Sequence, residues 1–196
     1  MTEEVPRGHI INTAHLPKQF PTHAHEGAFW ESLGRVIATF GFLEEMLAKA
    51  IFAFTATRPY EESEIEEAFE QWLPKLECAL TDPLGGLIDS FGKAVRDHPD
   101  EAITNLPDLL NDLRKASAMR NILCHRSWRL PDSGGASVPL FVNRQKEVVE
   151  TAMDCAYLDQ VQRHAAALAC SVINTVTNIG WQFPGSTGPG KPIWNS

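Results

Sequence analysis

Apolar side chains recur at steps of three and four residues along most of this chain, the spacing that places them on one face of an α-helix. The longest such pattern runs from about Glu26 to Thr57 and is expected to form a long amphipathic helix. Its apolar positions are Phe29, Leu33, Val36, Phe40, Leu43, Leu47, Ile51 and Phe54. A second helix is expected to begin where Ser63 and Glu66 have the spacing of a capping box, and Pro74 should bend it.

Two further helical patterns follow in the middle of the chain. The first begins after Pro83, a residue type favoured in the first turn of a helix, and ends before Pro99. The next is expected to open near Asn105 or Pro107 and to carry the hexapeptide RNILCH, residues 120–125, in its last turn. This pattern predicts an arginine, an asparagine and a histidine close to the end of one helix.

The period changes after that hexapeptide and then returns to helical spacing. SWRLP and VPLFVN, on either side of DSGGAS, predict two short strands joined by a Gly-Gly turn, a β-hairpin insertion over about residues 127–143. A last helix is expected from about residue 154 to 181. We therefore predict an all-α fold, an antiparallel bundle of four to five helices over residues 26–182. An irregular arm at 1–25 should precede it and a flexible tail at 183–196 should follow.

Composition fits a single folded domain. At 196 residues, with 43% hydrophobic and 21% charged residues, the chain is long enough for one core. Its start lacks the apolar region of a secretory signal, and no apolar run approaches the roughly 20 residues that span a bilayer. The four cysteines are widely separated and predict free thiols. We expect a cytoplasmic protein with no membrane segment, no metal and no cofactor.

The net charge of −8 argues against a protein that coats nucleic acid, because that behaviour depends on many Lys and Arg side chains neutralising phosphates. One stretch differs from this average. Residues 113–131 contain five Lys and Arg side chains and no Asp or Glu, a net charge of +5. The rest of the chain therefore carries a net charge of −13. The basic side chains of this stretch are Arg114, Lys115, Arg120, Arg126 and Arg129.

Glutamates gather at the start of the second predicted helix. Negative charge stabilises a helix N-terminus, so the simplest interpretation is a solvated helix face. A docking face for a basic partner is the alternative. The residues are Glu61, Glu62, Glu64, Glu66, Glu67 and Glu70.

The hexapeptide offers a cation and a titratable base. On a helix Asn121 and His125 share a face, so the amide could orient the imidazole, whereas Arg120 lies about 140° from His125 around the axis. One helix would aim the cation and the base apart unless its end unwinds or a second copy of the chain supplies the partner residue. Cys124 points about 100° away from its neighbour His125 and is expected to be a small core residue.

An Arg, a polar residue, three further residues and a His at the end of a helix resemble the signature of the HEPN superfamily (higher-eukaryote and prokaryote nucleotide-binding). Many HEPN members are metal-independent endoribonucleases, often toxins or antiphage effectors, in which two chains bring two motifs into one cleft. The resemblance implies that Arg120 holds the scissile phosphate, Asn121 positions neighbouring groups and His125 is the general base or acid. The products would be a 2′,3′-cyclic phosphate and a 5′-hydroxyl.

The resemblance further implies a homodimer that acts on RNA in a toxin or antiphage-defence role, with a neutralising antitoxin protein as a partner. The basic neighbours Arg114, Lys115, Arg126 and Arg129 would bind RNA phosphates. Arg126 is a departure, because family motifs frequently have a small residue directly after the His. Two alternatives stay open: a noncatalytic HEPN-like module that binds nucleotide, RNA or a protein, and a helix end at which the motif arginine merely pairs with an acidic neighbour.

Overall fold

The computed structural model describes residues 10–56, 61–99, 105–142, 148 and 150–185, apart from the side chains of 75, 76, 79 and 80. Its regular structure in these ranges is helical, which confirms the all-α class predicted from the sequence. The five α-helices are α1 (Gly27–Ala56), α2 (Ile65–Thr81), α3 (Leu84–Arg96), α4 (Leu106–Cys124) and α5 (Cys155–Asn178).

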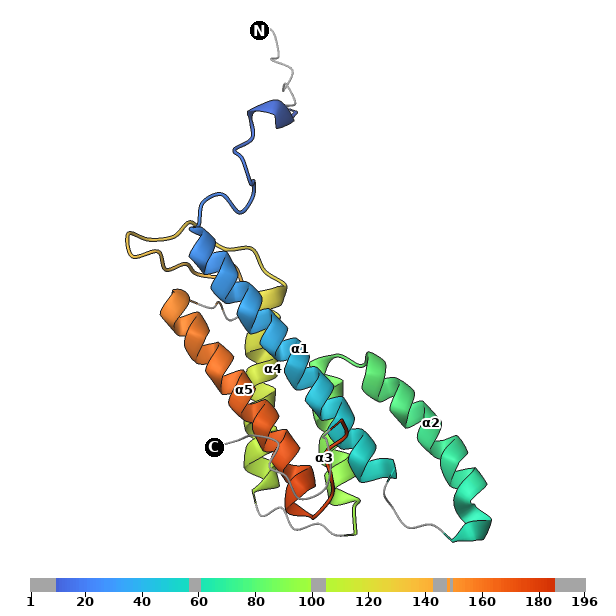
Figure 1. The fold of residues 1–196 in the computed structure, drawn as a ribbon. Helices are drawn as coiled ribbons and strands as arrows, with labels where there is room; N and C mark the ends of the chain where they lie inside the picture. The colour runs from blue at the N-terminus through green and yellow to red at the C-terminus, as the bar shows by residue number, and fades with distance from the viewer. Residues whose placement is uncertain (1–9, 57–60, 100–104, 143–147, 149, 186–196) are drawn as a thin grey trace, which may run out of the picture.

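Successive helices run in alternating directions, so that α1 and α5 lie side by side and parallel, with α4 antiparallel to both (Figure 1). The central element is α1, which contacts each of the other four α-helices. Its residues at three- and four-residue steps are fully buried, among them Val36, Leu43 and Leu47 at 0% exposure. The long apolar pattern of the sequence therefore forms the middle of the hydrophobic core.

The start of α2 differs from the sequence expectation, which placed a capping box there. Ser63 lies inside a short 3-10 helix, Glu62–Glu64, that precedes α2, and no side chain caps α2. The predicted capping box does not form because a capping residue needs an extended backbone, which a residue inside a 3-10 turn lacks. By contrast, Asp154 caps α5, its carboxylate accepting a hydrogen bond from the Tyr157 N–H at 2.7 Å.

The predicted β-hairpin over about residues 127–143 is not supported. In the described part of this segment there are isolated β-bridges, such as that between Trp128 and Pro139, and no strand. The chain does reverse direction, because the Arg129 N–H donates to the Val138 carbonyl at 3.0 Å. A regular ladder is interrupted because Pro139 has no N–H to donate.

The two ends of the chain behave differently. Residues 10–25 contain one short 3-10 helix, Thr13–His15, and extend away from the bundle (Figure 1). Phe183, at the first position of the predicted tail, is only 5% exposed and belongs to the core. Residues 1–9 and 186–196 lie outside the described part of the chain, so the structure does not test the predictions made for them.

His25 joins the base of the arm to α1. Its ring stacks on Phe29 with 4.6 Å between ring centroids and meets Trp30 edge-on at 5.2 Å. Both ring nitrogens are buried and make no hydrogen bond to any described residue. Burial therefore lowers the pKa of His25 below its usual value of 6.5.

We expect acidification to destabilise the protein through His25. The folded state favours the neutral ring, so below about pH 6.5 the unfolded chain binds a proton that the folded chain does not. The contribution of His25 to stability is complete above that pH and declines as the pH falls toward the lowered folded-state pKa. Urea denaturation of the wild type and of His25→Phe between pH 5 and 8 measures the effect. Equal pH slopes for the two proteins would contradict it.

Candidate functional site

The hexapeptide at the end of α4 brings its arginine and histidine together within one chain. The helix ends at Cys124, and His125 is the C-cap residue with φ −115° and ψ 13°, outside the helical region. Arg120 Nη1 consequently lies 3.2 Å from His125 Nε2. Of the two solutions that the sequence left open, the observed one is that the helix end unwinds; no second copy is needed for this contact.

The contact is compatible with one tautomer of a neutral imidazole. A guanidinium has only donors, so a hydrogen bond from Arg120 requires the Nε2 atom of His125 to accept, which leaves the ring proton on Nδ1. His125 and Asn121 are both exposed to solvent, and Arg120 is half-buried. A ligand approaching this end of α4 can therefore reach the imidazole and the amide.

Asn121 contacts the arginine rather than the histidine. Its Oδ1 accepts from Arg120 Nη1 at 3.3 Å, whereas its carbonyl oxygen accepts the backbone N–H of His125 at 3.3 Å. The amide thus helps to orient the guanidinium, and the expectation that it orients the imidazole is not met.

Glu44 of α1 is a member of the site that the sequence reasoning did not name. Its Oε1 lies 3.5 Å from Arg120 Nη2, and the two side chains are 28% and 25% exposed. The contact is an ion pair without hydrogen-bond geometry, so the buried Oε1 atom makes no hydrogen bond to a described residue. Arg120 is therefore held between a carboxylate on one side and an imidazole on the other.

This charge pair also acts on the thiol next to His125. Burial raises the pKa of Cys124, the positive charge of Arg120 lowers it, and the negative charge of Glu44 raises it. Cys124 is half-buried and lies outside the core cluster, so the prediction that it is a core residue is wrong.

We expect Glu44→Gln to lower the pKa of Cys124, because the change removes a neighbouring negative charge and keeps the side-chain shape. The rate of alkylation by iodoacetamide against pH, followed for the Cys124 peptide by mass spectrometry, should shift to lower pH. Cys78 is exposed and serves as the internal control, since its pH profile should stay the same. A Cys124 profile identical to that of the wild type would contradict the proposed charge coupling.

The basic residues around the motif are dispersed, and two of them are paired. Arg114 reaches Asp89 of α3 at 3.0 Å, and Lys115 pairs with Asp112 at 2.9 Å. The stretch that contains no acid in sequence is thus partly neutralised by acids from other turns and other helices. Beyond the helix, the Arg126 guanidinium lies 5.0 Å from the centre of the Phe141 ring, and the Arg129 side chain is exposed.

Two kinds of site are absent from the described residues. No group of three or more His, Cys, Asp and Glu side chains lies in an arrangement that could hold a metal ion. Nor does any described helix contain a stretch of the length and apolarity that crossing a membrane requires.

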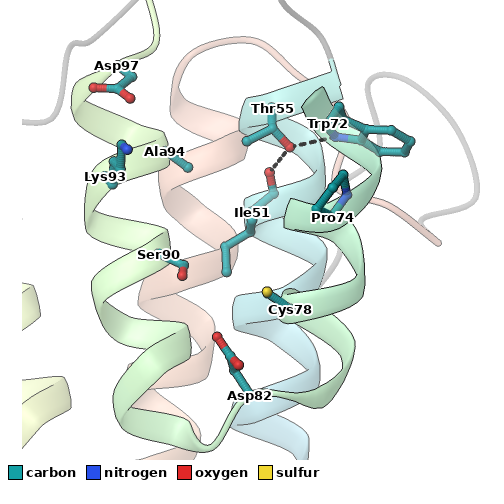
Figure 2. A pocket seen from close by; sticks show the side chains of 10 residues that line it. All are labelled: Ile51, Thr55, Trp72, Pro74, Cys78, Asp82, Ser90, Lys93, Ala94 and Asp97. Carbon is teal, nitrogen blue, oxygen red and sulfur yellow. Dashed lines mark hydrogen bonds between the residues drawn. The ribbon is translucent and has the colours of Figure 1, made fainter. Parts of the chain in front are cut away.

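A second candidate site lies away from the motif, where α2 and α3 stand over α1. The cavity measures about 340 Å³. Figure 2 shows Ile51, Trp72 and Pro74 of α1 and α2 on one side of it and Ser90 and Lys93 of α3 on the other. The lining residues are Ile51, Thr55, Trp72, Pro74, Cys78, Asp82, Ser90, Lys93, Ala94 and Asp97. No pattern in the sequence predicts this cavity, because its lining residues come from three helices that meet only through packing on α1.

Comparisons of the chain with protein-family models, with curated proteins and with solved structures find no match.

Proposed function

We propose that the chain is a HEPN-like, metal-independent endoribonuclease that acts as a homodimer in a toxin or antiphage-defence role. The contact between Arg120 Nη1 and His125 Nε2 carries the proposal, because it joins a permanent cation to a titratable base at a solvent-exposed helix end. Asn121 supports it, because its Oδ1 accepts a hydrogen bond from Arg120 Nη1 and helps to orient the guanidinium.

The reaction is an intramolecular transesterification, in which phosphorus exchanges its bond to the 5′-oxygen for a bond to the neighbouring 2′-oxygen. Arg120 binds the scissile phosphate with paired donors and stabilises the charge that develops on it. Phosphate binding replaces the contact between the guanidinium and the imidazole, so that Nε2 of His125 becomes free to accept a proton. His125 then takes the proton of the 2′-hydroxyl, and the 2′-oxygen forms the new bond to phosphorus. The bond to the 5′-oxygen breaks, and that oxygen takes a proton from a second imidazole or from water. A homodimer would supply the second imidazole from the partner chain.

The products define the experiment. Cleavage of a mixed-sequence RNA by the purified chain should leave 2′,3′-cyclic phosphate and 5′-hydroxyl ends, which enzymatic end-labelling identifies. We expect the rate to be unchanged in excess EDTA, because the mechanism uses a guanidinium and an imidazole and no metal ligand. Loss of cleavage on chelation, with recovery on addition of Mg²⁺ or Mn²⁺, would rule out the Arg120 and His125 mechanism.

A second candidate function is a noncatalytic helical module that binds nucleotide, RNA or a protein partner. The ion pair between Arg120 and Glu44 favours it, because an arginine that neutralises a buried carboxylate oxygen has a structural role within one chain. The same RNA assay separates the two functions. Binding of RNA without cleavage, unaffected by loss of the histidine, is the outcome that supports the module.

A further inference from the structure

The α2 helix exposes an apolar stripe that no described part of the chain covers. Ile65, Phe69 and Leu73, at steps of four residues, are 54%, 56% and 41% exposed. Side chains four apart on a helix lie above one another, so the three form one continuous strip along α2. Phe52 of α1, 39% exposed, lies beside Trp72 of α2 with 5.6 Å between ring centroids and widens the apolar surface.

A notch at the start of the stripe is shaped to receive a side chain. It measures about 210 Å³ and lies between the last turn of α1 and the first turns of α2. Two of its lining residues are joined, because the Trp72 Nε1–H donates to Thr55 Oγ1 at 3.0 Å (Figure 2). The residues that line it are Thr55, Ala56, Ile65, Ala68, Phe69 and Trp72. A rigid apolar notch of this kind suits an anchoring side chain of a partner.

The charge around the stripe identifies the partner's chemistry. Residues 61–82 contain eight acidic side chains and one basic, a net charge of −7 of the −8 carried by the whole chain. Glu66 and Glu70 each follow a stripe residue by one position, so they lie about 100° around the helix and form a rim along it. All the described glutamates of α2 and of the 3-10 turn before it are exposed.

We propose that this face of α2 is a docking site for a basic amphipathic helix of another protein. The apolar side of that helix covers the stripe and inserts one bulky residue into the notch, and its Lys and Arg side chains meet the glutamate rim. A second copy of this chain fits poorly, because a symmetric pairing of α2 would bring glutamates against glutamates. The proposal does not depend on the ribonuclease assignment.

The test uses a fluorescein-labelled 18-residue peptide of Leu and Lys in an amphipathic helical pattern, titrated with the full chain and followed by anisotropy. A peptide with every Lys replaced by Glu is the charge control. We expect the basic peptide to bind, more weakly as salt rises, and the acidic peptide not to bind. Ile65→Ser with Phe69→Ser, and separately Glu66→Lys with Glu70→Lys, should each weaken binding tenfold or more, a loss of about 1.4 kcal/mol.

Ile37→Ser is the matched control, because Ile37 is an exposed residue of α1 at 40% exposure and lies outside the stripe. Its affinity for the peptide should equal that of the wild type. Wild-type affinity in either double variant, or equal binding of the acidic peptide, would overturn the proposal. Light scattering gives a further contrary outcome: if the wild type self-associates and Ile65→Ser with Phe69→Ser does not, the face is an interface between copies of this chain.

Discussion

His125→Ala should lower RNA cleavage by about 10²- to 10⁴-fold, the usual loss when a general acid or base is removed. The free energy of unfolding should change by no more than about 0.5 kcal/mol, because the side chain is exposed and its described contact is with Arg120. A thermal melt and an RNA cleavage assay on wild type and variant at the same concentration measure both quantities. The pairing of a large catalytic loss with a native melt is the result that assigns His125 to catalysis.

His164→Ala is the matched control for that experiment, since His164 is an exposed helical histidine on α5 and should show wild-type cleavage. Arg120→Ala requires a different design, because it leaves the Glu44 carboxylate without its ion-pair partner. Combining it with Glu44→Gln removes that charge, so the remaining loss of cleavage reports on the arginine. A His125→Ala protein that melts early yet keeps wild-type cleavage per folded molecule would contradict the catalytic assignment.

Phe40→Ala should destabilise the fold by about 3 to 5 kcal/mol, a large share of the 5 to 15 kcal/mol that typically holds a domain together. Phe40 is 2% exposed and belongs to the core cluster around α1. Loss of its ring removes buried apolar surface and leaves a cavity that neighbouring helices fill only in part. The melting temperature should fall by roughly 6 to 20 °C, measured by circular dichroism.

Phe42→Ala provides the comparison within the same helix. Phe42 is 37% exposed, so the same chemical change should cost far less. Similar melting temperatures for the two variants would show that α1 is not packed as the structure describes it.

The helices were predictable because their apolar spacing is set by the helix itself. The pattern from about Glu26 to Thr57 matches α1 closely, and Asp154 begins α5 as expected. Local sequence patterns were less reliable where one pattern favoured a strand and a neighbouring residue type opposed it. The alternating residues after Ser127 indicated strands, yet a proline within them interrupts the backbone hydrogen bonding.

The sequence predicted the residues of the candidate site that lie on α4, but not the residues of other helices that surround them. The spacing of Arg120, Asn121 and His125 selected them, but their geometry depends on a cap conformation that helical angles do not describe. Glu44 could not be selected, because it comes from another helix far away in sequence and meets Arg120 only through packing of α1 against α4. The same cause explains why Arg114 and Lys115 turn out to be paired.

The side-by-side packing of α1 and α5 has a consequence for folding on the ribosome. Roughly 100 residues separate the end of α1 from the start of α5. At the usual 5 to 20 residues per second, α1 waits about 5 to 20 s for the neighbour that covers much of its apolar face. During that interval the part of the α1 surface that α5 covers in the folded state has no such neighbour. Closing this long-range contact carries a larger loop-closure entropy cost than the contacts between helices that follow one another in the chain.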